Sequence, residues 1–306
     1  MNLAALQGSL ELGIIYAIMA LGVFVSFRTL NMPDLTVDGS FVLGAAVSAV
    51  LSAAGQPLAA IAVAFFVGGI AGCVTALLHT KLKVQPLISG ILVMLALYSV
   101  NLRVMGNKSN VPLRNVATVY TIFKESPVED YIKLITSIAI LLIVLVLLFF
   151  FLKTRLGFVL RATGDNDQMV RALGVNTDFT KLLGLALSNG LVAMSGALIA
   201  QYQSFADIGM GVGMVVIGLA SVIIGEVIFG VNTLLRKLIA VVLGSIFYRF
   251  VIAFAFDLGM PPTDLKLVSA IIVAIALSMP EVKERVYSLR KRLKARDVGK
   301  EGNPGA

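Results

Sequence analysis

Long stretches without a charged side chain alternate with short polar segments along this chain of 306 residues. Residues 39–78 hold no Asp, Glu, Lys or Arg, and residues 84–102 and 182–206 are equally free of charge. A transmembrane helix needs about 20 such residues to cross the hydrocarbon core, so the pattern predicts an all-α, polytopic membrane helix bundle of about nine spans. The spans are expected at 11–29, 35–54, 57–79, 85–105, 131–152, 181–203, 212–230, 236–257 and 265–280.

The charges between and after these spans give the bundle an orientation. Residues 281–306 hold eight basic and four acidic residues. Segments beside the cytoplasmic face of a membrane are enriched in Lys and Arg. We therefore expect residues 1–280 to form one transmembrane domain and residues 281–306 to form a basic cytoplasmic tail. The same tendency accounts for the net charge of +8 without a nucleic-acid partner.

One loop conflicts with this orientation. Alternation of the spans places residues 103–133 on the outer side, although five basic residues lie there. The positive-inside tendency disfavours that placement. We keep the outer placement, with a pair of missed or re-entrant elements near 111–123 as the alternative.

The composition narrows the chemistry that this chain can carry. Hydrophobic residues make up 58% of it and the mean hydropathy is +0.95, which no soluble packing arrangement hides. A single Cys and a single His exclude an internal disulfide framework and a His-rich metal site. No nucleophile-and-base arrangement and no cofactor motif is visible, so we expect no catalytic residue, no metal and no cofactor bound by this chain.

A polar segment interrupts the apolar sequence between the first two spans. Pro33 lies in it, removes a backbone donor and disfavours helix at the preceding residue. Irregular backbone at membrane depth is tolerated only where it is buried in protein or lines a watery cavity. The segment is either a break that lines a translocation path or a cytoplasmic turn in which Asp34 or Thr36 caps the next helix. The path candidates within it are Asn31, Asp34, Thr36, Asp38 and Ser40.

Residues 33–38 and 206–211 resemble each other weakly, since each follows one span and precedes a span rich in Gly and Val. The predicted topology puts the first toward the inside and the second toward the outside. Such an arrangement is typical of an inverted repeat in a transporter. A possible inverted repeat is therefore part of the predicted fold.

Isolated charges within the spans are costly and usually face a cavity or a partner. Glu11 and Glu226 are expected near span ends, where the cost is small. Arg249 lies several turns from either end of its span, between Tyr248 and Phe250. It either pairs with a carboxylate, lines the path or extends toward the outer surface, and it joins the path candidates.

The longest inner loop, residues 155–177, predicts a short helix. Asp165 can act as N-cap with Gln168 three residues later, Gly174 is a natural stop, and Arg171 suits the last turn. Met169 and Leu173 are among the apolar residues that such a helix exposes to the cytosol. Either a soluble subunit docks on them or the helix rests on lipid.

These residues carry a resemblance. The stretch from Arg161-Ala162-x-Gly164 to Gly174-Val175-Asn176-Thr177 resembles the coupling segment of bacterial ABC importer permeases of the branched-chain amino-acid and ribose type. Residues 13–22, 31–40, 195–198 and 224–230 are similar to other segments of that family, so the similarity covers about 10–280. Glu226 departs from the family, which commonly has a small residue there. The chain looks most similar to permeases whose lipoprotein partners handle aromatic amino acids.

The resemblance implies a permease domain at 1–280 in the bacterial inner membrane, paired with a second copy. It also implies two cytoplasmic ABC ATPase subunits and an extracytoplasmic substrate-binding protein or lipoprotein. The coupling residues carried over from it are Arg161, Gly164, Asp165, Gln168, Met169, Arg171, Leu173 and Gly174.

The expected function is import of a small solute, an amino acid by resemblance, at the expense of ATP. No G-x-x-x-x-G-K-[ST] segment occurs in the sequence, so ATP and Mg²⁺ belong on the partner subunit and this chain is not itself an enzyme. The alternatives are an ABC importer for a sugar or nucleoside, and a secondary transporter that uses Asp34, Asp38 or Arg249 to couple an ion gradient.

Overall fold

A computed structural model describes residues 3–114, 116–121, 131–230, 232–261, 264, 267–275 and 278 of the chain. The predicted all-α class is confirmed, since helices account for nearly all of the regular structure. The elements in chain order are α1 (Leu3–Val23), η1 (Phe24–Thr29, a π-helix), α2 (Thr36–Ala53), α3 (Pro57–Thr80), α4 (Pro86–Val104), β1 (Asn110–Pro112), α5 (Ile132–Lys153), α6 (Arg155–Asp165), α7 (Asp167–Ala172), α8 (Thr177–Gln203), β2 (Phe205–Asp207), α9 (Met214–Phe229) and α10 (Leu234–Asp257).

Seven of these helical segments are long and apolar enough to cross a membrane: α1 with η1, α2, α3, α4, α5, α8 and α10. The expected count of about nine is only roughly supported. α9, at 16 residues, is too short to be counted with them. The ninth predicted span, 265–280, and the basic tail, 281–306, lie partly or wholly outside the described residues, although 267–275 is helical.

The first helix starts earlier than the sequence pattern indicates. It begins at Leu3, so Glu11 lies inside the helix and is only 4% exposed, which corrects its expected place near a span end. Its carboxylate accepts hydrogen bonds from Tyr202 Oη (2.8 Å) and Gln7 Nε2 (3.1 Å). These two donors make an acidic residue tolerable within the bundle, since they compensate its lost hydration.

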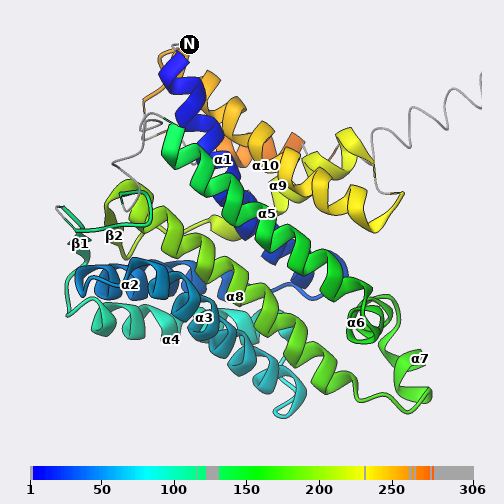
Figure 1. Ribbon diagram of the computed structural model, residues 1–306. Helices are drawn as coiled ribbons and strands as arrows, with labels where there is room; N and C mark the ends of the chain where they lie inside the picture. The colour runs from blue at the N-terminus through cyan, green and yellow to red at the C-terminus, as the bar shows by residue number, and fades with distance from the viewer. Residues whose placement is uncertain are drawn as a thin grey trace, which may run out of the picture.

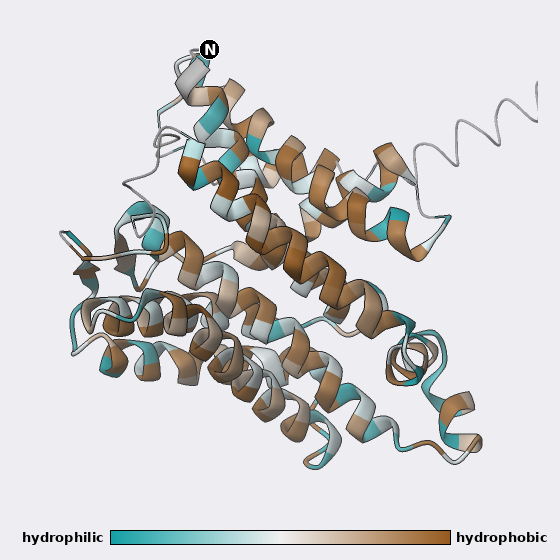
Figure 2. Ribbon diagram, viewed as in Figure 1, coloured by the Kyte–Doolittle hydropathy of each residue, from teal (hydrophilic) through white to brown (hydrophobic). Residues whose placement is uncertain are grey.

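The helices divide into an inner set and an outer set. α1 and α8 are mostly enclosed by protein, at 83% and 72% buried over their apolar windows, whereas α5 is only 22% buried and is the most hydrophobic of the seven. Figure 1 shows α1, α9 and α10 on one side of the bundle and α2, α3, α4 and α8 on the other, with α5 along their length. In Figure 2 α5 is brown along most of its length, as expected for a lipid-facing helix.

Polar structure gathers at the two ends of this bundle. β1 and β2 form an antiparallel pair at one end, with Asn110 opposite Asp207, and α6 and α7 lie at the other (Figure 1). Because β1 belongs to the 103–133 loop and β2 follows α8, the two loops lie on the same face, as alternation of the spans requires. The alternative of re-entrant elements near 111–123 is wrong for the described part, which is a short strand and turns.

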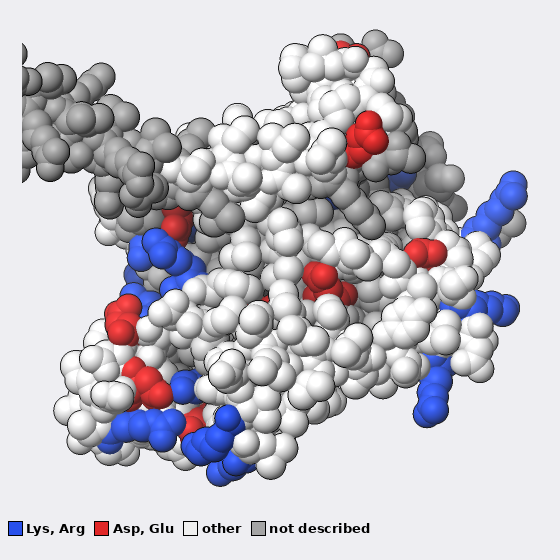
Figure 3. All heavy atoms as spheres, turned by 180° about the vertical axis from the view of Figure 1, so that it is seen from behind, with Lys and Arg blue, Asp and Glu red and all other residues white. Residues whose placement is uncertain are grey.

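Charged side chains follow the same division. Figure 3 shows Lys and Arg at two opposite edges of the molecule, with a broad and mostly uncharged surface between them. Such a distribution is typical of a protein whose middle faces hydrocarbon and whose ends face water. The structure therefore agrees with a multi-pass membrane protein.

Close packing of the inner helices depends on glycine. A Cβ atom on Gly44 of α2 would meet the backbone carbonyl of Ala193 in α8, and one on Gly72 of α3 would meet the backbone of Leu185 in the same helix. Small residues let helix backbones approach closely in lipid, where no hydrophobic force drives helices together. α8 is thus the central helix against which α2 and α3 pack.

We predict that Gly72→Ala destabilises the purified protein while Gly69→Ala, on the same helix, does not. A Cβ on Gly69 lies 3.4 Å from the Ala186 carbonyl, an ordinary contact, whereas the Gly72 substitution forces α3 away from α8. Overpacking of this kind costs about 1–3 kcal/mol. Both changes gain the same helix propensity, so the difference between the two unfolding temperatures in detergent isolates the steric effect. Equal temperatures for the two variants would contradict it.

Candidate functional site

The segment between η1 and α2 joins the first two membrane-crossing helices and is partly buried, with Asn31 and Pro33 exposed. Asn31 adopts a left-handed backbone conformation (φ 53°) and α2 starts only at Thr36. Asp34 is 1% exposed; its Oδ1 accepts the Thr36 backbone N–H (2.9 Å) and its Oδ2 accepts the Asn189 side-chain amide (2.7 Å). Asp34 therefore caps the start of α2, one of the roles expected for it, and does so as a buried side chain.

Asn189 of α8 links this break to its surroundings. Its Nδ2 also donates to the Leu185 carbonyl (3.1 Å), and its Oδ1 accepts the Ser40 hydroxyl (2.7 Å). One turn earlier on α2, the Thr36 hydroxyl lies 2.7 Å from that of Thr75 in α3. The side chains of Asp34, Thr36 and Ser40 are thus paired inside the protein, as a low-dielectric environment requires.

A second break precedes α9 and meets the first. Asp38 accepts backbone N–H groups from Gly213 (2.9 Å) and Val215 (2.8 Å), so its carboxylate lies at the N-terminus of α9. A negative charge is stabilised there by the helix dipole. Gly211 packs directly on the Asp38 backbone carbonyl. The sequence placed segments 33–38 and 206–211 toward opposite sides of the membrane. In the structure they are in contact, because residues 208–213 run inward along α2.

Of the predicted path residues, Asp38 opens onto a cavity. This cavity of about 230 Å³ lies between α2, α4 and residues 208–212, and Met94, Tyr98 and Asn101 also line it. Asp34, Thr36 and Ser40 are buried and do not line it, while Asn31 is exposed. Among the path residues predicted in this segment, Asp34, Thr36 and Ser40 thus form a buried hydrogen-bonded group, Asp38 lies at a cavity wall, and Asn31 belongs to neither.

Arg249 is held inside the bundle by an aromatic ring. Its guanidinium carbon lies 3.8 Å from the ring centroid of Tyr16 in α1, and its Nε is buried without a hydrogen-bond partner among the described residues. No ion pair joins it to a described carboxylate. A cation–π contact compensates part of its desolvation. The structure therefore neither pairs it with an acid nor places it at the cavity of Asp38.

The predicted coupling helix is present but begins one residue later than expected. The N-cap of α7 is Asn166, whose Oδ1 accepts the Met169 N–H at 3.0 Å, and not Asp165, which is the last residue of α6. Local rules favour Asp and Asn equally as caps, so neighbouring residues of these types cannot be separated from sequence. The expected stop is confirmed, since Gly174 has φ 82° after the helix ends.

Ion pairs fix α7 on the start of α8. Asp167 accepts from Lys181 Nζ (2.8 Å) and Arg171 Nε (3.3 Å), and Arg171 also reaches Asp178 (2.7 Å). Although partial burial acts in the opposite direction, the charge and hydrogen bond of Lys181 and the hydrogen bond of Arg171 lower the pKa of Asp167 to about 2. The stabilisation from this ionised carboxylate is fully present above its ordinary pKa and is lost only as pH falls through about 2.

The helix fixed in this way presents apolar side chains outward. Val170 is buried beneath it, whereas Met169 is 54% and Leu173 is 72% exposed. Gln168 and Arg171 are exposed on the same short helix. A rigid, partly apolar projection of this kind is suited to docking on another protein.

α6 connects this projection to the break. A Cβ on Gly164 would meet the Thr29 backbone at the end of η1, and Gly184 of α8 packs against the Leu30 side chain. Arg161 of α6 lies beside Phe158, with its guanidinium 5.8 Å from the ring centroid. The predicted coupling residues and the predicted break are therefore joined through backbone contacts at one end of the molecule.

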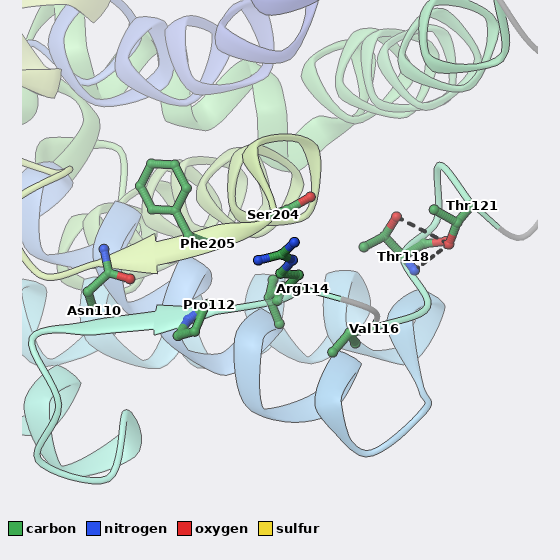
Figure 4. Close-up of a pocket in the computed structure, with 9 residues that line it drawn as sticks. Asn110, Pro112, Arg114, Val116, Thr118, Thr121, Ser204 and Phe205 are labelled. Atoms are coloured by element: carbon green, nitrogen blue, oxygen red, sulfur yellow. Dashed lines mark hydrogen bonds between the residues drawn. The ribbon is translucent and has the colours of Figure 1, made fainter.

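The other end carries a pocket that the sequence did not reveal. It has a volume of about 700 Å³ and lies beside the β1–β2 pair and residues 116–121. Figure 4 shows the Arg114 side chain between the strands and the Thr118–Thr121 turn, below Ser204. The sequence held one signal for this pocket. Five basic residues lie in 103–133 on the outer side, where the positive-inside tendency disfavours them, and Arg114 is one of them.

Helices broken within the bundle, a projecting helix at one end and a pocket at the other define a membrane transport protein. The sequence profile described as "Branched-chain amino acid transport system / permease component" matches residues 5–277, and the chain belongs to this family. The family resemblance seen in the sequence is thereby confirmed.

Individual relatives refine the comparison. The chain is 44% identical to a tyrosine transport system permease protein of Clostridioides difficile over 266 residues, which cover 87% of this chain and 88% of the relative. It is 36% identical to an uncharacterised protein of Rickettsia prowazekii over 88% of this chain and 95% of that one. The ribose import permease protein of Escherichia coli K12 is 24% identical over 88% of this chain and 83% of its own length. No solved structure gives a significant match.

We predict that Asn189→Leu destabilises the protein more than Ser40→Ala does. The first change removes the amide that binds Asp34 and leaves a buried carboxylate oxygen without a partner, which costs about 1–3 kcal/mol or more. The second removes only the donor to Asn189 Oδ1. Thermal unfolding of the three proteins in the same detergent measures the order, and a Ser40 variant less stable than the Asn189 variant would refute this account of the break.

Proposed function

We propose that this chain is the membrane subunit of an ATP-driven importer that carries an amino acid, with aromatic amino acids as the leading class. The observation that carries this proposal is the rigid α7 projection, fixed by Asp167 and Arg171 and exposing Met169 and Leu173. A separate ATPase subunit needs an exposed, rigid element of the membrane subunit to bind. This sequence holds no phosphate-binding loop of its own, so the ATPase must be another chain. The 44% identity to a tyrosine permease supports the substrate class.

The assembly that follows has two copies of this chain, two ATPase subunits on the α6–α7 side and a substrate-binding protein or lipoprotein on the β1–β2 side. The α6–α7 end and the C-terminus face the cytoplasm of a bacterium and the membrane is its inner membrane. ATP and Mg²⁺ bind to the motor subunits. Family membership supports motor and binding-protein partners in general, and the choice of two identical permease copies is our proposal.

In the proposed mechanism, a movement of α7 is transmitted by α6 to the segment before α2 and from there to the segment before α9. Closure of the ATPase pair on ATP displaces α7, and α6 transmits the displacement to η1 through the contact of Gly164 with Thr29. Because Asp38 is bonded to the N-terminus of α9, movement of α2 shifts the wall of the cavity that it lines. Access to a path between the two permease copies then alternates between the two sides of the membrane.

The decisive experiment reconstitutes the chain in vesicles with and without the ATPase that co-purifies with it. We expect tyrosine uptake only with the ATPase, ATP and the binding protein present. Uptake by the chain alone, sensitive to pH or sodium, would instead establish the secondary transporter. Competition by ribose and nucleosides at equal concentration separates the sugar and nucleoside alternatives from amino-acid import.

We predict that Gly174→Val uncouples ATP hydrolysis from uptake, whereas Gly55→Val does not. Both glycines have open space around the missing Cβ and nearly the same backbone angle, φ 82° and φ 79°, but Gly55 lies between α2 and α3 at the opposite end of the bundle. A β-branched residue at such an angle costs about 1–2 kcal/mol and distorts the turn after α7.

The measurement compares ATP turnover with uptake in vesicles that contain equal amounts of each variant. Gly174→Asn serves as a rescue, since Asn tolerates the left-handed conformation. Loss of uptake of the same size in the Gly55 and Gly174 variants would show that strain alone, and not the position of α7, causes the defect.

A further inference from the structure

A cavity at the α6–α7 end is separate from the cavity beside Asp38 and has Met169 of α7 in its lining. It has a volume of about 700 Å³ and lies between η1, α6, α7 and the start of α10. Its polar lining consists mainly of Arg28, Thr29, Arg161, Asp165, Thr233 and Lys237. Three of these side chains are basic and one is acidic, so the cavity favours an anion.

The basic side chains of this cavity differ in how far they are already neutralised. Arg28 is paired with Glu226, which lies 2.8 Å from its Nε. Arg161 and Lys237 form no ion pair with any described residue, and Arg161 Nε is buried without a hydrogen-bond acceptor. A buried N–H without an acceptor is costly, so its presence indicates that an acceptor enters from outside the chain. Asp165 lies on the same wall and reduces the positive charge without pairing with either cation.

Apolar side chains also line the cavity. Phe158 of α6 lines it and is 65% exposed, and Leu234 in the first turn of α10 lines it as well. α10 enters the apolar layer at this point, since it is one of the membrane-crossing helices. Charged groups beside exposed apolar ones, at the end of a transmembrane helix, match the amphipathic chemistry of a phospholipid.

We propose that this cavity binds the phosphate-bearing headgroup of an anionic phospholipid from the adjacent leaflet. The phosphate accepts hydrogen bonds from Arg161 and Lys237, and the acyl chains lie along Phe158 and Leu234. Guanidinium groups suit phosphate because their N–H donors match its oxygens in pairs. The bound lipid joins α6 to η1 and α10 and thereby holds the base of the coupling projection in place.

The test measures lipid retention by the purified full-length chain. We expect wild-type protein in nanodiscs of phosphatidylglycerol to keep bound lipid after transfer to detergent, as counted by native mass spectrometry, and to unfold at a higher temperature than protein from phosphatidylcholine. The double variant Arg161→Gln, Lys237→Gln is expected to bind the anionic lipid at least about tenfold more weakly, since hydrogen bonds between charged groups correspond to factors of that order.

Two controls make the result specific. The double variant Lys81→Gln, Lys83→Gln removes the same charge from exposed lysines after α3 and is expected to retain the lipid as wild type does. Arg161→Lys keeps the charge and is expected to restore part of the binding. Equal retention by the cavity variant and wild type, or equal loss in the Lys81, Lys83 control, would overturn the proposal.

Two further arms distinguish the sources of the anion. Stabilisation by inorganic phosphate in phosphatidylcholine discs, as large as that by phosphatidylglycerol, would show that the cavity takes free phosphate and not a lipid. Loss of the retained lipid once the ATPase subunits are bound would show that a protein group fills the cavity in the assembled transporter. Neither readout depends on transport, so the proposal and the proposed function fail separately.

Discussion

The structure depends on hydrogen bonds that two carboxylates make to interrupted backbone inside an apolar bundle. Asp34 accepts a backbone N–H at the start of α2, and Asp38 accepts two backbone N–H groups at the start of α9. In hydrocarbon each open backbone N–H would cost several kcal/mol, so these breaks persist only because side chains pair with them. Both carboxylates come from one short segment, and that segment therefore determines where two different helices begin.

This arrangement explains why the packing around the breaks is so close. Asn189 reaches Asp34 only because α8 lies directly against α2 and α3, and that approach requires glycine where the backbones meet. The same helix starts at the ion pairs of α7 and ends beside β2. α8 thus provides a rigid reference between the two polar ends, around which α1, α9 and α10 are arranged on the other side (Figure 1).

The sequence predicted where most of the membrane-crossing helices lie. It did not predict the contacts between residues that are far apart in the chain. Span positions followed from apolar stretches, since lipid leaves the chain few choices. The stop at Gly174 followed from its local chemistry. The meeting of Asp38 with Gly213 and of Arg249 with Tyr16 joins residues about 175 and 233 positions apart, which no local pattern encodes. The choice of Asn166 over Asp165 as cap was missed because both residues satisfy the same local rule.

The contacts at the α6–α7 end determine which movements of the coupling segment reach the breaks. Gly164 lies on the backbone of Thr29 without an intervening side chain, so rotation of a side chain cannot absorb a displacement of α6. Asp34, five residues after Thr29, is hydrogen-bonded to Asn189 of α8. The glycine contacts with α2 and α3 hold α8 in place. Residues 30–33 connect η1 to Asp34. Within them Asn31 has a left-handed backbone and Pro33 donates no hydrogen bond, while the N–H groups of Leu30 and Met32 are bonded to carbonyls of η1, each at 3.0 Å. A displacement of η1 therefore carries Leu30 and Met32 with it and reaches α2 at Pro33 and Asp34.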